Sequence, residues 1–260
     1  MSTRLVAAAI APHGTPALEE GPTRSALEEI GRRFVAAAPE ATIVLTPHNV
    51  HVEGHFAVVT AASVGGSLAE SGRADVALVR QVDRTLADAV VRAARAAELP
   101  ALGVSYGGND PASAVAPLDW GTLIPLHFLP ETPVVVVSPA RERPLEEHVR
   151  LGVAIAAACE GRRVALVASA DHGHAHDPDG PYGFDPAAAA YDERVVELVR
   201  ANSLHRLTEL APIVDAAKAD SLWQLLVLHG ALGDAYDVEL LCYEAPTYFG
   251  MLCAVYASSA

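Results

Sequence analysis

Short apolar runs recur along the whole chain, and stretches with a helical pattern separate them. Runs of this length that are rich in valine and bounded by turn residues are typical of buried strands. They predict strands at Leu5–Ala11, Thr42–Thr46, Phe56–Ala61, Ala101–Ser105, Val134–Val137, Arg163–Ala168, Val238–Tyr243 and Leu252–Ala257.

Amphipathic stretches between these runs predict helices. Ser25 and Glu28 form a capping box that would open a helix over Ala26–Ala38. The stretch Asp75–Ala97 carries charges on one face and predicts one long helix. Further helices are expected at Leu145–Cys159, Ala190–Arg200 and Ser221–Gly230. This alternation favours an α/β fold, in which a mixed, mostly parallel sheet is flanked by helices in three layers. No repeat or linker divides the chain, so we expect a single domain over residues 1–260.

Composition narrows the possible partners and the compartment. The formal net charge is −14, from 18 basic and 32 acidic residues, and such a surface repels phosphate backbones and anionic membranes. Nucleic acid and membranes are therefore not expected partners. The three cysteines form no CxxC pair, which indicates a reducing compartment. The first apolar run, Leu5–Ala11, is too short to span a bilayer. We expect a cytoplasmic protein.

Four of the predicted strands end in side chains that can bind a metal or move a proton. These side chains are His13, His48, the pair His172 and His174, and Glu244. If the strands share one sheet and point the same way, the groups can meet at one edge of it. A carboxylate in an apolar segment such as that of Glu244 is costly unless it has a partner. Two imidazoles and one carboxylate suit Fe(II), with positions left for substrate and dioxygen. Zn(II) would also accept this set.

The segment Ser169–Pro186 supports a second interpretation. His172, His174 and His176 stand at alternate positions directly after a predicted strand. Such a set could hold a zinc ion by itself, although His176 occupies the position that is Asp in the HxHxD motif of zinc hydrolases. A zinc-dependent hydrolase that uses these three histidines therefore stays open as an alternative.

Five short blocks together resemble a known family. They are Ile10-Ala-Pro-His13, Val44-Leu-Thr-Pro-His48, Leu118-Asp-Trp-Gly-Thr-Leu-Ile-Pro-Leu126, Ser169-Ala-Asp-His-Gly-His174 with Asp179-Gly-Pro-Tyr-Gly183, and Tyr243-Glu-Ala-Pro246. In this order they resemble the LigB-like class III extradiol ring-cleavage dioxygenases. The Memo-like proteins and the AmmeMemoRadiSam system protein B are relatives of that family.

The resemblance implies a role for several residues. His13, His48 and Glu244 would bind Fe(II), and His174 would be the catalytic acid and base. The implied activity inserts dioxygen into a catechol-type or aminophenol-type ring and opens it. Trp120 stands where many relatives have His, and it could stack on an aromatic ring.

The resemblance to this family also implies which residues line the pocket and which partners the protein has. Trp120, His127, His172 and Tyr182 are candidate pocket residues. The partners would be a small aromatic diol and O2, and we expect a homo-oligomer, a dimer or larger, with a small partner subunit as a further possibility. The sequence does not single out one catechol or aminophenol, and it places no basic residue in the pocket. A Memo-like protein that binds metal or a partner without catalysis is the non-enzymatic alternative.

Overall fold

The computed structural model describes residues 5–233 and 235–258. Its main feature is an eight-stranded mixed sheet with the strand order β10-β11-β1-β9-β2-β8-β3-β6. The strands are β1 (Ala7–Ala11), β2 (Ala41–Leu45), β3 (Phe56–Val59), β6 (Ala101–Val104), β8 (Val134–Ser138), β9 (Val164–Ser169), β10 (Tyr236–Glu244) and β11 (Met251–Ser258). Each overlaps one of the predicted strands, so the predicted α/β class is confirmed.

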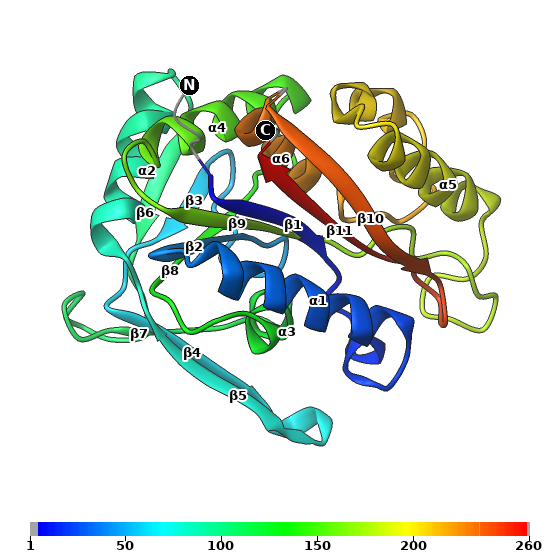
Figure 1. Ribbon diagram of the computed structural model, residues 1–260, viewed down its shortest axis with the longest axis horizontal. Coiled ribbons are helices and arrows are strands. Elements are labelled where there is room, and N and C mark those ends of the chain that lie inside the picture. Colours follow the sequence, from blue (N-terminus) through cyan, green and yellow to red (C-terminus); the bar gives the residue numbers. More distant parts are fainter. Residues whose placement is uncertain (1–4, 234, 259–260) are drawn as a thin grey trace.

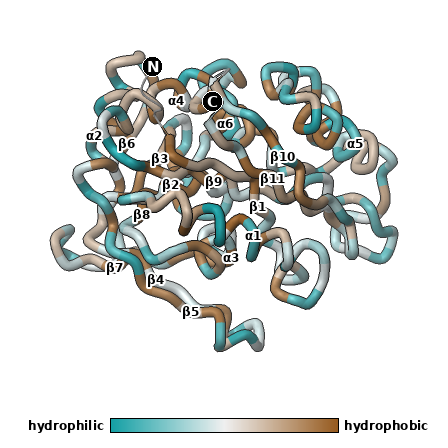
Figure 2. The backbone as a smooth tube through the Cα atoms, in the orientation of Figure 1, coloured by the Kyte–Doolittle hydropathy of each residue, from teal (hydrophilic) through white to brown (hydrophobic). Residues whose placement is uncertain are grey.

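The centre of the sheet consists of parallel strands. β9 pairs in parallel with β1 and with β2, and β2 pairs in parallel with β8. Every residue of these four strands is buried, which is typical of parallel strands that helices cover on both faces. The antiparallel hairpin β10–β11 extends the sheet beyond β1, and β3 pairs antiparallel to β8 at the other side. Figure 2 shows the apolar character of the central strands.

Helices cover both faces of the sheet, which gives three layers (Figure 1). One face carries α1 (Pro22–Ala37) and α3 (Trp120–Phe128), which contact each other. The opposite face carries α2 (Arg84–Ala96), α4 (Leu145–Ala158), α5 (Pro186–Arg200) and α6 (Leu222–Leu232). Short 3-10 helices lie at η1 (Thr15–Leu18), η2 (Ala69–Ser71) and η3 (Leu204–Leu210).

The long helix expected over Asp75–Ala97 is wrong in its first part. Residues Arg73–Gln81 form strand β5, and α2 begins only after Asp83, whose side chain accepts a hydrogen bond from the backbone N–H of Leu86. β5 joins β4 (Ser63–Leu68) and β7 (Val115–Pro117) in a separate three-stranded sheet with the order β5-β4-β7. Pairing with β4 satisfies the backbone of this segment, an interaction that its charge pattern alone does not reveal.

The first helix also begins differently from the prediction. α1 starts at Pro22 after Gly21, with no side-chain cap, and Ser25 lies inside the helix. Proline is well suited to the first turn because it lacks a backbone N–H, and an N–H at this position would have no partner within the helix. The predicted capping box of Ser25 and Glu28 is therefore wrong. Helix α3, which contains Pro125, was not predicted at all.

Candidate metal centre and active site

Three neighbouring parallel strands deliver the site residues to one edge of the sheet. β9 lies between β1 and β2, and all three run in the same direction. His13 follows β1, Asp171 follows β9 and His48 follows β2. The carboxyl ends of parallel strands are where open α/β sheets place their ligands. The predicted convergence of His13 and His48 is therefore present in the structure.

His13 and His48 meet a third group, Asp220. The Nε2 atoms of the two histidines are 3.1 Å apart. Oδ2 of Asp220 lies 3.5 Å from Nε2 of His13 and 3.2 Å from Nε2 of His48. Ligand atoms about 2.1 Å from one metal ion are separated from each other by about 3.0–3.5 Å, so the three atoms fit one ion. In the part of the chain that the structure describes, this is the only group of three or more such side chains that could hold a metal.

A serine fixes the tautomer that metal binding requires of His13. The hydroxyl of Ser169 donates to the carbonyl oxygen of Gly121 and lies 2.9 Å from Nδ1 of His13. Because its one hydrogen is donated to Gly121, the hydroxyl oxygen must accept a hydrogen bond from Nδ1–H of His13. The neutral imidazole then carries its hydrogen on Nδ1 and directs the lone pair of Nε2 toward His48 and Asp220.

Asp119 holds the loop that carries His48. Its side chain caps α3 by accepting from the N–H of Thr122, and it also accepts from the hydroxyl of Thr46 at 2.7 Å and from Nδ2 of Asn49 at 2.8 Å. The start of α3 approaches this loop closely, because a Cβ added at Gly121 would lie 2.6 Å from Oγ1 of Thr46. Asp119 thereby ties the loop that carries His48 to the N-terminal end of α3.

Charge and burial make this cluster electrostatically unusual. Burial alone would lower the pKa of His13, but the carboxylates Asp171, Asp220 and Asp119 outweigh it and raise the pKa to about 9. Burial would raise the pKa of Asp220, yet the facing histidines hold it well below its usual range. Oδ1 of Asp220 is buried without a hydrogen-bond partner. A cation at the cluster would compensate this orphaned acceptor, so the donor set fits a metal ion.

The predicted ligand Glu244 needs correction. It ends β10, and its Oε1 accepts hydrogen bonds from the backbone N–H of Thr23, at 3.1 Å, and from the Thr23 hydroxyl. Thr23 lies in the first turn of α1, where free N–H groups stabilise a carboxylate. Glu244 is not part of the cluster, and Asp220 provides the carboxylate beside the two histidines.

His174 faces the space above the cluster. Its Nδ1 donates to the carbonyl oxygen of His172 at 2.7 Å, so the neutral ring leaves Nε2 free to accept a proton. The imidazole stacks on Phe249, with ring centroids 5.4 Å apart, and it meets Tyr182 edge-on at 5.9 Å. It lines the same two cavities as His48. This position suits the predicted acid and base.

The other two histidines of that segment have separate partners. His172 is fully buried, with Nδ1 3.0 Å from the hydroxyl of Ser221, and burial lowers its pKa. Nε2 of His176 lies 2.9 Å from a carboxylate oxygen of Asp192. These rings do not converge with His174, and the three form no group that could hold a metal. The zinc site proposed for His172, His174 and His176 is therefore wrong.

Two cavities adjoin the cluster. One, of about 490 Å³, is lined by His13, His48, Trp120, Asp171, His174, Tyr182 and Phe249, among others. The other, of about 360 Å³, shares His48, His174 and Tyr182 with it. Trp120 is half exposed and lies over His48, with ring centroids 4.5 Å apart. Of the candidate pocket residues, Trp120 and Tyr182 line the larger of these cavities.

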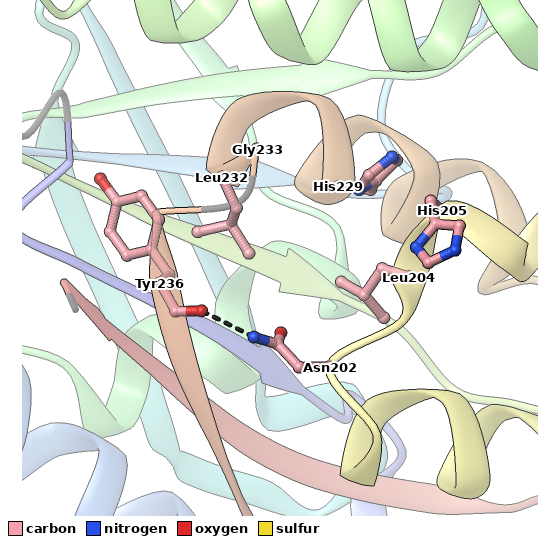
Figure 3. Close-up of a pocket in the computed structure, with 7 residues that line it drawn as sticks. All are labelled: Asn202, Leu204, His205, His229, Leu232, Gly233 and Tyr236. Carbon is pink, nitrogen blue, oxygen red and sulfur yellow. Dashed lines mark hydrogen bonds between the residues drawn. The ribbon is translucent and has the colours of Figure 1, made fainter.

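The remaining pocket candidates do not line these cavities. His127 is exposed near the end of α3, in a separate surface groove with Phe128. His172 is buried beneath the site. A third, much smaller cavity lies beside α6, where Nδ2 of Asn202 donates to the carbonyl oxygen of Tyr236 at 2.8 Å (Figure 3). Its volume of about 20 Å³ is too small for a substrate.

Sequence reasoning missed Asp220, Asp171 and Asp119. The strand pattern points only to polar groups that follow strands, whereas Asp220 precedes helix α6 and Asp119 precedes α3. Asp171 does follow strand β9, but a lone aspartate beside three histidines carries no pattern of its own. A signal was available for Asp220, because an acidic residue two positions before the very apolar helix Leu222–Leu232 is expected to be drawn into the core.

The fold and the site define an α/β protein with a His/His/Asp group that could bind a metal. Residues 7–254 match the family described as the catalytic LigB subunit of aromatic ring-opening dioxygenase, and the chain belongs to this family. The predicted resemblance is thereby confirmed at the level of the family.

Two individual proteins show how far this likeness extends. The protein CA_C1420 of Clostridium acetobutylicum is 23% identical over 230 residues, which cover 85% of this chain and 49% of that protein. The chain thus spans about half the length of this curated relative. The solved structure of the uncharacterized protein JW3007 from Escherichia coli K12 has the same fold, with a TM-score of 0.66 at 18% identity. That match covers 97% of this chain and 99% of that chain. Among the described residues, no helix has the length and apolar character needed to cross a bilayer.

Proposed function

We propose that this chain is a non-haem Fe(II)-dependent dioxygenase that opens a catechol-type or aminophenol-type ring by extradiol cleavage. The observation that carries the proposal is the convergence of His13, His48 and Asp220 beside a cavity with aromatic walls, which His13 and His48 help to line. Two imidazoles and a carboxylate on one side of an ion are the ligand set of non-haem Fe(II) oxygenases. Membership of the LigB family supports the same activity.

His13, His48 and Asp220 would hold the ion, and bound Fe(II) would bring the aromatic diol and dioxygen together and let electrons pass between them. The ligand geometry is prepared in advance, because Ser169 orients His13 and Asp119 restrains the loop of His48. Such outer hydrogen bonds fix the ring orientation and strengthen the ligand.

His174 is proposed to move the proton. With Nδ1 committed to the carbonyl of His172, its Nε2 can take a proton from a substrate hydroxyl and return it as the ring opens. The stack on Phe249 and the edge contact with Tyr182 restrict rotation of the imidazole. His174 therefore presents one nitrogen to the cavity in a defined orientation.

The aromatic walls suit a flat ring. Trp120, Tyr182, Tyr248 and Phe249 line the larger cavity. Offset or edge-on contacts between such side chains and a substrate ring add stabilisation beyond the burial of surface.

The proposal is tested by oxygen consumption. The protein is stripped of metal, loaded with Fe(II) without air, and mixed with a panel of catechols and aminophenols in an oxygen electrode, while absorbance records the yellow ring-opened product. We expect consumption with Fe(II) and none with Zn(II) or with Asp220→Asn. If Fe(II) is bound stoichiometrically and the whole panel stays unreacted, the dioxygenase assignment is wrong and the non-enzymatic, Memo-like alternative is favoured.

A further inference from the structure

The smaller of the two cavities beside the cluster differs from the larger one in charge. Its lining includes Arg141 and Lys218 in addition to His48, His174 and Tyr182. No arginine or lysine lines the larger cavity. Arg141 follows β8, the parallel strand next to β2, so a fourth strand end delivers a functional group to the same edge of the sheet. Lys218 stands two residues before Asp220.

These two cations are exceptional in an acidic protein. The formal net charge of the chain is −14, and Lys218 is its only lysine. Among residues 5–233 and 235–258, no carboxylate lies within ion-pair distance of Arg141 or Lys218. The exposed Asp215 lines the same cavity, and Asp220 is the metal-binding carboxylate. Two positive charges without an ion-pair partner among the described residues thus line the cavity. The negative charge of the nearby Asp220 carboxylate would be neutralised by a bound metal ion.

The contact that Arg141 does make leaves its hydrogen-bond donors available. Its guanidinium carbon lies 4.7 Å from the ring centroid of Trp223, in a cation–π contact. Trp223 itself is buried at the start of α6 and lines the cavity. A cation–π contact occupies no hydrogen-bond acceptor, so the N–H donors in the plane of the guanidinium stay available. Arg141 is therefore restrained by Trp223 and keeps a planar fork of donors that matches a carboxylate.

We propose that Arg141 and Lys218 form a subsite for a carboxylate substituent of the aromatic substrate, with the ring bound at the His13–His48–Asp220 cluster. This inference rests on the proposed function. It narrows the substrate class to anionic ring diols or aminophenols and assigns their charged end to the smaller cavity. A carboxylate fits better than an ester or alkyl group, because two donors of one guanidinium can bind both oxygens while the ammonium supplies a second charge.

The test compares an acid with its neutral analogue. The probes are 3,4-dihydroxyphenylacetate and its methyl ester, which differ in charge but not in the ring. For Fe(II)-loaded wild-type protein, Arg141→Gln, Lys218→Gln and the control Arg92→Gln, the ratio of kcat/KM for acid to ester is measured. Arg92 is exposed on α2 and lines neither cavity. Anaerobic calorimetry gives the dissociation constants of both probes, and metal content is measured for every variant.

We expect the acid-to-ester ratio to fall about tenfold or more in Arg141→Gln and less in Lys218→Gln, with Arg92→Gln unchanged, because hydrogen bonds to charged groups have this strength. The ratio of the ester's dissociation constant to that of the acid, both from calorimetry, should fall in parallel.

If wild-type protein cleaves acid and ester equally well and Arg141→Gln changes nothing, the subsite is wrong while the dioxygenase stands. If neither probe is cleaved but the acid binds preferentially through Arg141, the subsite stands and the proposed reaction is wrong. Equal binding of both probes overturns the subsite in either case.

Discussion

The imidazole of His13 is held through Nδ1 by the hydroxyl of Ser169, 2.9 Å away, so that Nε2 is the nitrogen that faces His48 and Asp220. Replacement of Ser169 by Ala removes the acceptor for the Nδ1 proton. We expect the affinity for a divalent metal to fall about 10–100-fold, the usual effect of losing such a partner.

Competition against a chromophoric chelator measures this affinity. Ser138→Ala is the matched control, because Ser138 ends β8, a parallel strand of the same sheet, and its buried hydroxyl has no partner among the described residues. An unchanged metal affinity in Ser169→Ala would show that the serine does not orient the ligand.

Asp220 and Glu244 offer a direct choice between two carboxylates. Asp220→Asn should lose most of the bound metal, since an amide nitrogen or a neutral oxygen replaces a charged ligand beside His13 and His48. Glu244→Gln should keep the metal and lose only stability, because Glu244 bonds to Thr23. Elemental analysis of both variants after identical loading decides the matter, and loss of metal from Glu244→Gln alone would reverse the assignment.

The strands and two of the metal-cluster residues could be predicted because both follow from local pattern. Valine-rich runs identify buried parallel strands, and a histidine just after such a run must lie at the sheet edge, as His13 and His48 do. Asp220 could not be placed this way, because its position depends on how α6 packs on β9, a contact that joins distant parts of the chain.

Glu244 shows why a sound energetic argument gave the wrong ligand. A carboxylate in an apolar strand does need a partner, and the sequence offered a metal as the obvious one. The structure supplies the first turn of α1 instead, where the N–H and hydroxyl of Thr23 satisfy the charge. Propensity also failed for β5, where pairing with β4 overrides a charge pattern that resembles a helix.

Metal binding and stability should both depend on pH through His13. Its pKa is raised to about 9 in the folded, metal-free protein, from 6.5 for the free side chain, because nearby carboxylates outweigh burial. Its contribution to stability is therefore fully present below pH 6.5 and is lost as the pH rises toward 9. We expect the Tm difference between metal-free wild-type protein and His13→Gln to shrink over this range.

The same proton competes with the metal for Nε2 of His13. Below the pKa of about 9, metal affinity should rise with pH by up to about tenfold per unit, with one proton released on binding. Calorimetry in buffers with different ionisation enthalpies counts that proton. A constant affinity from pH 6 to 9 would contradict the assignment of His13 as the titrating ligand.

His174→Phe separates proton transfer from metal binding. Phenylalanine keeps a flat ring against Phe249 but has no nitrogen to accept a proton. We expect metal content to stay at the wild-type level and kcat to fall about 10²–10⁴-fold, the usual contribution of a general acid or base. Tyr182→Phe, which keeps the ring but removes a hydroxyl on the same cavity wall, is the comparison. Normal turnover in His174→Phe would remove His174 from the proton transfer.

The buried carboxylate of Asp192 holds the segment that carries His174 from both sides. It accepts from the N–H of Gly173 at 2.7 Å, lies 2.9 Å from Nε2 of His176, and accepts from the hydroxyl of Tyr243 at 2.8 Å. Asp192→Asn replaces one acceptor oxygen by a donor and leaves a buried donor without a partner. We expect a loss of about 1–3 kcal/mol in the free energy of unfolding.

Because His174 lies between the two anchored positions, Asp192→Asn should also lower kcat more than it changes KM or metal content. A role in stability alone would leave kcat of the folded protein unchanged, so denaturation curves and steady-state kinetics distinguish the two. The control is Glu193→Gln, the exposed neighbour on α5. If Asp192→Asn unfolds more easily but turns over at the wild-type rate, the carboxylate supports the fold without positioning His174.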